Sequence, residues 1–224
     1  MNQKAVFLDI DNTIIKGTTV NILVRYCYKI NILSLKLVAR ALYWYLLYKL
    51  NFIKDFSKIV DKTSFIMNDI LQKLPAEEIN KIMEQCFEKE IVPKIYLQTK
   101  ALMDKFNKEG YKIFLISSTL QPLAELLQLH LGYGTVVATE IEKNEGYYTG
   151  KIKGAVCFGN EKLRRIEEIN KAEHIDFQQS YAFSDHISDI PMLERVGKAI
   201  LVNPSRKFGK IAKKRGWEVM KVSL

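Results

Sequence analysis

The chain has 224 residues, of which 48% are hydrophobic and 26% are charged. This composition is typical of a globular protein in water, and the length suffices for one large domain or for a core with an insertion. The formal net charge of +9 favours anionic partners such as phosphorylated metabolites, a lipid surface or nucleic acid, without choosing among them. A surplus of solubilising lysines explains the same charge equally well.

A membrane span is excluded by the distribution of charge along the most apolar stretch, residues 35–52. Lys36, Arg40 and Lys49 interrupt this stretch and leave only residues 41–48 free of charge. A span needs about 18 to 20 apolar residues. The sequence therefore predicts a soluble protein.

The three cysteines indicate a reducing compartment. Cys27, Cys86 and Cys157 are far apart, odd in number and without the spacing of metal ligands, which is typical of small buried thiols. We expect no signal peptide, because Met1 leads within a few residues into a strand. A cytoplasmic location is predicted.

Strand and helix patterns alternate along most of the chain. Short apolar runs rich in strand-forming residues occur at 5–8, 113–116, 180–183, 199–202 and 218–222. Helical patterns occur at 94–109, 120–130, 160–170 and 190–195. This alternation predicts an α/β fold with a parallel sheet covered on both faces. Ligands of such sheets bind at the carboxyl ends of the strands, where Asp9 and Ser117 are expected to lie.

A helical block without a convincing strand separates the first strand from the second. Its apolar residues have helical spacing at 20–28, 33–50, 54–66 and 76–90, and its only proline is Pro75. We expect residues 1–17 and 93–224 to form the core and residues 18–92 to form an inserted helical cap. A module inserted directly after the first strand is well placed to cover a site there as a lid.

Two further segments have recognisable patterns. Residues 136–141 and 147–152 flank Glu142–Gly146, which predicts a β-hairpin with a glycine at the turn. Residues 206–215 contain six basic residues, and the solvated face of a terminal helix explains them.

The first strand ends in two carboxylates, Asp9 and Asp11, followed by Asn12 and Thr13. Two acids at the end of a buried strand cost desolvation energy unless a cation or a reaction requires them. At close range they repel each other unless a divalent metal or a shared proton relieves the repulsion. The pattern therefore indicates an active site.

Three later segments supply complementary groups. They are the strand end Ile116-Ser117-Ser118-Thr119, Lys162 near the start of a helix, and Ser184-Asp185-His186-Ile187-Ser188-Asp189. Hydrolysis of a phosphate ester through an aspartyl-phosphate needs a carboxylate nucleophile, a second carboxylate as acid and base, and donors for the phosphate oxygens. Mg²⁺ prefers oxygen ligands, commonly one or two carboxylates with waters and phosphate.

In this order the four segments resemble the motifs of the haloacid dehalogenase superfamily of phosphohydrolases. The match covers nearly the whole chain, because the helical insertion is similar to the type-one (C1) cap of that superfamily, placed on a Rossmann-like core. The segments 147–152, 189–193 and 202–204 and the pair Gly216-Trp217 resemble the branch that contains phosphoserine phosphatase (subfamily IB).

The resemblance implies a role for each matched residue. Asp9 would be the nucleophile and a ligand of Mg²⁺, and Asp11 would be the general acid and base with its backbone carbonyl on the metal. Asp185 would bind Mg²⁺, and Asp189 would steady Lys162 or belong to the metal shell. Lys162 would hold the nucleophile and the phosphate. The phosphate-binding set would be completed by Thr13, which braces the motif, Ser117 and the amide of Ser118.

Two features have competing interpretations. His186 adjoins Asp185 but stands where the family favours a small residue, so we interpret it as a residue at the rim of the site. Ser184 is a second departure, because it replaces the glycine that is usual in the family. The aromatic run Tyr43-Trp44-Tyr45 fits core packing of the cap, and it also fits weak contact with a membrane surface.

The substrate is expected to be a small phosphometabolite or a lipid-like phosphate. Phosphoserine phosphatases carry a glutamate nine residues after the nucleophile that reads the serine ammonium, and Thr18 occupies this position here. Phosphoserine phosphatase proper and a phosphotransferase are the alternatives. A non-enzymatic protein that binds an anionic ligand or nucleic acid is a third, although no recognition motif supports nucleic acid.

Overall fold

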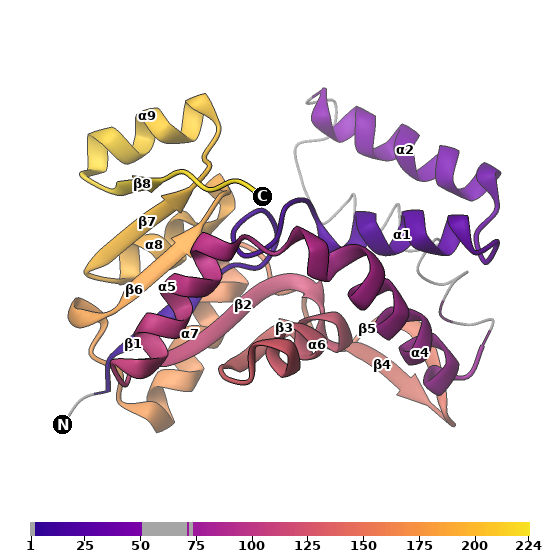
Figure 1. Ribbon diagram of the computed structural model, residues 1–224, viewed down its shortest axis with the longest axis horizontal. Coiled ribbons are helices and arrows are strands. Elements are labelled where there is room, and N and C mark those ends of the chain that lie inside the picture. Colours follow the sequence, from indigo (N-terminus) through magenta and orange to yellow (C-terminus); the bar gives the residue numbers. More distant parts are fainter. Residues whose placement is uncertain (1–2, 51–70, 72–73) are drawn as a thin grey trace.

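The computed structural model describes residues 3–50, 71 and 74–224. At its centre is a parallel sheet of six strands in the order β3-β2-β1-β6-β7-β8 (Figure 1). The strands are β1 (Ala5–Leu8), β2 (Lys112–Leu120), β3 (Thr135–Thr139), β6 (Tyr181–Ser184), β7 (Lys198–Val202) and β8 (Glu218–Met220). β1 lies between β2 and β6. The predicted α/β fold with a parallel sheet is confirmed.

Helices cover both faces of the sheet, and the strands bury side chains on each face. In β1, Val6 and Leu8 belong to one hydrophobic cluster and Ala5 and Phe7 to the other, because successive strand residues point to opposite faces. The first cluster includes residues of α5 (Leu97–Lys108) and α6 (Gln121–Leu131). The second includes residues of α7 (Asn160–Glu173), α8 (Ile190–Arg195) and α9 (Arg206–Arg215). Burial on both faces explains why these strands are almost continuously apolar.

A helical segment leaves the sheet after β1 and returns before α5. Its described elements are α1 (Thr19–Lys29), α2 (Leu35–Lys49), α4 (Ala76–Cys86), a π-helix (Phe87–Ile91) and a 3₁₀-helix (Val92–Lys94). Backbone hydrogen bonds join the two ends of the segment: the Lys16 amide donates to the Lys94 carbonyl, and the Tyr96 amide donates to the Ile14 carbonyl. The segment therefore starts and ends beside the loop that carries the acid pair.

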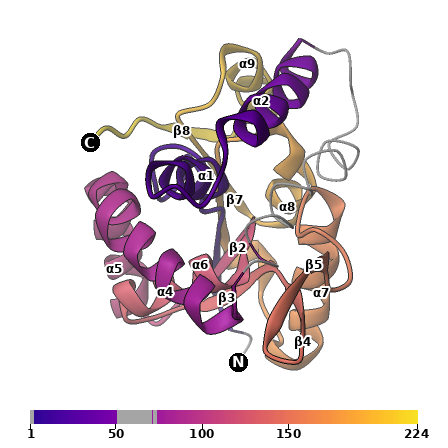
Figure 2. The ribbon, with the colours of Figure 1, turned by 90° about the vertical axis from the view of Figure 1, so that its right-hand side faces the viewer.

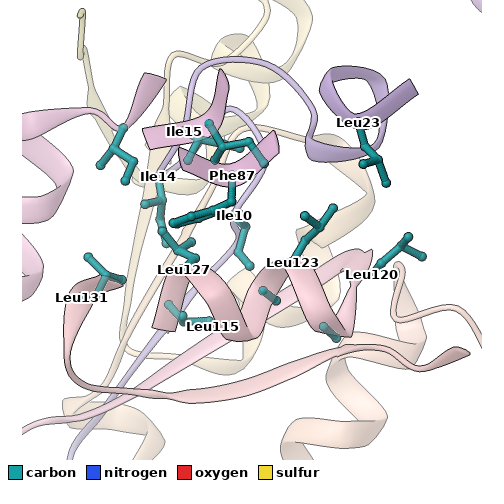
Figure 3. Packing of buried hydrophobic residues seen from close by; sticks show 14 of the residues in the cluster. Ile10, Ile14, Ile15, Leu23, Phe87, Leu115, Leu120, Leu123, Leu127 and Leu131 are labelled. Atoms are coloured by element: carbon teal, nitrogen blue, oxygen red, sulfur yellow. The ribbon is translucent and has the colours of Figure 1, made fainter. Parts of the chain in front are cut away.

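The helical segment shares a core with the sheet domain. Figure 3 shows Phe87 of the π-helix among Ile10 and Ile14 from the loop after β1 and Leu127 of α6. Leu23 of α1 belongs to the same cluster. Burial of such side chains contributes about 1.5 to 3 kcal/mol each. The loop after β1 is therefore held by apolar packing on both sides.

The predicted hairpin is correct only in part. β4 (Ile141–Asn144) and β5 (Tyr147–Ile152) form an antiparallel pair, and the turn places Glu145 and Gly146 at positive φ. Residues 135–139, however, form β3 and pair in parallel with β2 in the main sheet. A single residue, Glu140, separates β3 from β4, so the expected first hairpin strand at 136–141 is wrong.

Helix positions agree with the sequence patterns except near Pro93. The pattern at 76–90 predicts one helix, whereas α4 ends at Cys86 and continues as the π-helix. The terminal helix at 206–215 is confirmed, and the pattern at 54–66 lies outside the described residues. In the described part of the chain, no helix combines the length and apolar character needed to cross a bilayer.

Candidate active site

The acid pair lies at the carboxyl end of the central strand β1. The amide of Asp9 donates to the Phe183 carbonyl of β6 at 3.0 Å, which continues the pairing of the two strands by one residue. The chain then turns tightly: Asn12 has φ 57°, and its side-chain oxygen accepts from the Gly17 amide at 3.0 Å. Asp11 follows in this turn. Burial raises the pKa of Asp9, and the charge of Asp11 is near enough to raise it further.

Lys162 joins two carboxylates in the interior. Its Nζ lies 2.6 Å from Oδ1 of Asp9 and 2.6 Å from Oδ2 of Asp189. Only 2% of Lys162 is exposed, and both acids are buried. Burial alone would lower the pKa of the Lys162 ammonium, but the charges of Asp189 and Asp9 outweigh burial and raise this pKa above its usual range. Lys162 is therefore a fixed cation beside the acid pair.

The carboxyl groups of the site have raised pKa values. Burial raises the pKa of Asp9 despite the opposing charge of Lys162, and burial raises the pKa of Asp11 against its hydrogen bonds from Thr19. Burial and the charge of Asp189 raise the pKa of Asp185 to about 7. One ammonium thus faces several carboxylates, so an additional cation would be stabilised here.

The loop after β6 satisfies both oxygens of Asp189. Oδ2 accepts from Lys162 and from the Ser184 hydroxyl at 2.7 Å, and Oδ1 accepts from the Ser188 hydroxyl at 3.2 Å. Ser184, which departs from the family's glycine, thereby acquires a structural role. His186 is exposed, and its Nδ1 lies 2.9 Å from the Ser188 hydroxyl. This exposure is compatible with a position at the rim of the site, which stays a prediction.

The end of β2 supplies hydroxyl groups. The Ser117 hydroxyl donates to Oγ1 of Thr119 at 3.1 Å, and Thr119 in turn donates to Oδ1 of Asp11 at 3.3 Å. Oδ1 of Asp11 also accepts from the Thr19 amide at 2.9 Å. Ser118 is half-buried, and its carbonyl accepts from the Thr139 hydroxyl at 3.0 Å. The structure thus brings this predicted strand end to the acid pair.

Thr13 occupies an unusual position among the predicted site residues. It is fully buried, and its carbonyl accepts from the Thr99 hydroxyl at 3.1 Å. Within the described residues its own hydroxyl is the one buried side-chain polar atom without a hydrogen-bond partner. Such a group costs free energy unless a further ligand or water satisfies it.

Sequence reasoning missed two residues of the site, Thr19 and Thr119. Both are buried, and their hydroxyl oxygens lie 2.6 Å apart beside Asp11. Thr119 ends the segment Ile116-Ser117-Ser118-Thr119, two positions after Ser117, so its place in the sequence indicated a possible site residue. Thr19 follows Thr18 at the start of the helical segment, and no sequence pattern marks it as a site residue.

The donor set fits a hard divalent cation. Asp9, Asp11 and Asp185 offer carboxylate and carbonyl oxygens, which Mg²⁺ prefers. The described residues contain no group of three or more histidine, cysteine, aspartate or glutamate side chains arranged to hold a metal by themselves. An ion in this place would therefore complete its coordination with waters and phosphate oxygens.

Comparisons with known proteins found a matching family model and several relatives. The family model of haloacid dehalogenase-like hydrolases matches residues 6–194. Phosphoserine phosphatase SerB1 of Mycobacterium tuberculosis is 29% identical over 142 residues, which are 63% of this chain and 46% of that protein. The chain thus spans about half the length of this relative.

Two other matches extend over nearly the whole chain. The inhibition of morphological differentiation protein of Streptomyces azureus is 26% identical over 221 residues, 96% of this chain and 77% of that protein. A crystal structure of a protein with unknown function from Bordetella pertussis Tohama I has a TM-score of 0.86 at 20% identity, covering 98% of this chain and 99% of that one. The latter match shows a shared fold.

Proposed function

The chain belongs to the haloacid dehalogenase-like hydrolase family, and on this premise we propose that it is a phosphatase that hydrolyses phosphate monoesters through an aspartyl-phosphate. One observation carries the proposal: Lys162 holds Oδ1 of Asp9 at 2.6 Å while Asp11 lies two residues further on. Among the described residues no hydrogen bond reaches Oδ2 of Asp9, so this oxygen is free to attack phosphorus.

The reaction proceeds in two displacements. Oδ2 of Asp9 forms a bond to phosphorus while the bond from phosphorus to the alkoxide oxygen breaks, and Asp11 donates its proton to the departing oxygen. Water then attacks the phosphorus of the acyl-phosphate, Asp11 accepts a proton from that water, and the Asp9 carboxylate and inorganic phosphate are released. A raised pKa lets Asp11 carry the proton that the first displacement needs.

The remaining residues neutralise charge and hold geometry. Lys162 stabilises the negative charge of the phosphoryl oxygens, with donors from Ser117 and the Ser118 amide. Thr13 braces the motif through its carbonyl, which accepts from the Thr99 hydroxyl, and its own hydroxyl has no partner within the described residues. Asp189 positions Lys162.

Magnesium belongs to the proposal. The side chains of Asp9 and Asp185 and the backbone carbonyl of Asp11 would hold it, and when bound it would neutralise negative charge on the phosphate. Asp189 was also predicted to belong to the metal shell. Both of its oxygens already accept hydrogen bonds, which favours its role beside Lys162.

The substrate class and the cap are proposed as well. Residues 18–92 would form a cap that reads the leaving group, and Thr18 gives this cap no carboxylate for a serine ammonium. A small phosphometabolite or a lipid-like phosphate is therefore preferred over phosphoserine.

Cys27, Cys86 and Cys157 are buried free thiols, which supports a cytoplasmic location. A phosphotransferase would use the same site with another hydroxyl in place of water.

The test is turnover of a panel of phosphate monoesters in Mg²⁺ and in EDTA. The panel contains p-nitrophenyl phosphate, phosphoserine, sugar phosphates and lysophosphatidate, and Asp9→Asn is measured beside the unmodified chain. Asp104→Asn is the control, because this carboxylate forms an ion pair with Lys100 at 3.0 Å on α5 and takes no part in the site. Metal-dependent turnover that only Asp9→Asn abolishes supports the proposal. Turnover that survives both EDTA and Asp9→Asn contradicts it.

A further inference from the structure

The positive charge of the chain is concentrated in two stretches of sequence. No aspartate or glutamate lies between Asp11 and Asp55, where there are seven basic residues, or between Glu194 and Glu218, where there are eight. The chain has 34 basic and 25 acidic residues in total, so the remainder contains more acidic than basic residues. The net charge of +9 therefore comes from two stretches of the sequence and is not spread evenly along the chain.

Each acid-free stretch contributes one helix to the same side of the molecule. The first includes α2 and the second includes α9. Figures 1 and 2, which differ by a quarter turn about the vertical axis, both place α2 and α9 at the top. We call this end the α2–α9 face, with α2 contributing Leu35–Lys49 and α9 contributing Arg206–Arg215.

An apolar stripe runs along the exposed side of α2. Leu35, Tyr43 and Leu46 are 64%, 57% and 52% exposed, and Leu50, just past the helix end, is 57% exposed. At about 100° per residue, these four positions and the exposed Ala39 lie within an arc of about 80°. Exposed apolar stripes of this kind mark sites that contact a partner or a membrane.

Basic residues border the stripe on α2. Lys36 and Arg40 are exposed, and helical spacing places them at one edge of the same arc. Cations beside an exposed apolar stripe would contact anionic headgroups where the stripe meets the acyl chains of a bilayer.

α9 supplies a second group of cations. Its apolar residues Phe208 and Ala212 are buried against the sheet domain. Its other side exposes Arg206, Lys207, Lys210, Lys213 and Lys214. Among the described residues, these five side chains have no ion-pair partner, whereas Arg215 pairs with Glu194 at 2.5 Å. α9 therefore presents uncompensated charge to solvent.

We propose that the α2–α9 face docks on a bilayer that contains anionic lipid. The cations of α9 and α2 would lie against the headgroups, and Tyr43, Leu46 and Leu50 would enter the boundary between headgroups and acyl chains. Nucleic acid would engage the cations but would leave the apolar stripe in water. A second copy docked through this face would bring the cations of α2 and α9 against the same cations, so like charges disfavour it.

This inference goes beyond the proposed phosphatase activity and does not depend on it. A chain held on an anionic bilayer would encounter phosphate esters carried by lipids at high local concentration. Docking would therefore favour lipid phosphates over free phosphometabolites as substrates.

The experiment is co-sedimentation of the full chain with vesicles of phosphatidylcholine alone and of phosphatidylcholine with phosphatidylserine. Lys210→Gln/Lys214→Gln should weaken binding to the anionic vesicles about 25-fold, at about fivefold for each cation near the surface. Tyr43→Ser/Leu46→Ser should weaken it by about tenfold or more. The control Lys108→Gln/Lys171→Gln removes the same charge from exposed positions in α5 and α7 and should change binding less than about twofold.

Retention of the thermal unfolding midpoint shows that each variant is folded. Binding to anionic vesicles alone, weakened by both α2 and α9 variants and by high salt, supports docking. An equal loss of vesicle binding in the control variant, or no binding to either kind of vesicle, would overturn the proposal. So would vesicle binding that Tyr43→Ser/Leu46→Ser leaves unchanged, or a dimer in lipid-free solution that this variant dissociates. Tighter binding to a DNA duplex than to vesicles would assign the face to nucleic acid instead.

Discussion

The hydroxyl oxygens of Thr19 and Thr119 lie 2.6 Å apart, although 100 positions separate the two residues in the chain. Thr19 begins α1, the first helix of the insertion, and Thr119 stands near the end of the core strand β2. Both reach Oδ1 of Asp11, Thr19 through its amide at 2.9 Å and Thr119 through its hydroxyl at 3.3 Å. The pair therefore fixes the orientation of the proposed acid and base and ties it to the start of the proposed cap.

Replacing Thr119 by valine should impair turnover in a way that depends on the leaving group. Thr119→Val keeps the shape of the side chain and removes its hydrogen bond to Asp11. Alkyl phosphates need a proton on the departing oxygen, so their kcat should fall by about 10- to 100-fold, within the range that general acids contribute. p-Nitrophenyl phosphate has a stable leaving group and should lose less than about threefold. Steady-state kinetics on both substrates measure the difference.

The control for this experiment is Thr99→Val. Thr99 is equally buried, but its hydroxyl donates to the backbone carbonyl of Thr13 at 3.1 Å and makes no contact with Asp11. It should affect both substrates alike. Equal losses on alkyl and p-nitrophenyl phosphate in Thr119→Val would show that Thr119 does not position the acid.

Much of the fold could be predicted from the sequence because the central strands are buried on both faces. Residues 5–8 were predicted from an apolar run, and β1 has the same limits. The boundary between β3 and β4 was missed, because only Glu140 lies between them and no glycine or proline marks the break. Where β3 leaves the sheet is decided by its pairing with β2. Local sequence does not contain that information.

The candidate site also has a part that could be predicted from the sequence and a part that could not. Asp9, Asp11 and Lys162 were predicted to share a site from their resemblance to the family motifs, and the structure places Nζ of Lys162 2.6 Å from Oδ1 of Asp9. The contact between Thr19 and Thr119 could not be found, because no spacing rule links the start of an insertion to the end of a strand 100 positions away. Hydrogen-bond partners depend on side-chain orientation, which a motif does not specify.

Removing the ammonium of Lys162 should destabilise the protein in a pH-dependent manner. Lys162→Met would leave Asp9 and Asp189 buried without their shared cation, which typically costs about 3 to 5 kcal/mol. The folded-state pKa of Asp9, which burial already raises, would rise further without Lys162, so the lost stability would be largest above that pKa and smaller in acid, where this carboxyl group is protonated. Urea unfolding at several pH values measures this dependence.

Lys100→Met is the matched comparison for Lys162→Met. Lys100 pairs with Asp104 at 3.0 Å, but both side chains are about one-third exposed, so its loss should cost less than about 1 kcal/mol at any pH. The double variant Lys162→Met/Asp189→Asn should recover part of the lost stability by removing one unpaired charge. Equal effects of Lys162→Met and Lys100→Met would contradict the buried ionic cluster.

The metal-free protein should lose stability as the pH rises through 7. The folded-state pKa of Asp185 is raised to about 7 from an ordinary 3.8, mainly by burial. A raised pKa stabilises the folded state fully below the unfolded value, and this contribution disappears as the pH passes the folded value. In EDTA at pH 8, Asp185→Asn should therefore be more stable than the unmodified chain, by about 1 to 3 kcal/mol after allowance for partial exposure.

Addition of Mg²⁺ should reverse that order. A metal binds the deprotonated carboxylate, so Mg²⁺ should raise the Tm of the unmodified chain more at pH 8 than at pH 6, and should raise that of Asp185→Asn little at either pH. Calorimetric scans of both proteins at pH 6 and at pH 8, each with Mg²⁺ and with EDTA, give the four increases in Tm. An equal increase for both proteins would exclude Asp185 as a ligand.

Two glycines outside the site should respond to alanine in opposite directions. A Cβ on Gly197 would lie 1.9 Å from the Gln178 carbonyl oxygen, while the Gly197 amide donates to the Phe177 carbonyl at 2.8 Å. Backbone must therefore move, and Gly197→Ala should cost about 3 kcal/mol or more. Gly209 lies inside α9 with its nearest neighbour, Cγ of Pro204, at 4.0 Å, so Gly209→Ala should stabilise by about 0.5 to 1 kcal/mol. Urea midpoints of the two variants measure both effects. A neutral Gly197→Ala would show that Gly197 does not pack closely against the 3₁₀-helix Phe177–Gln179.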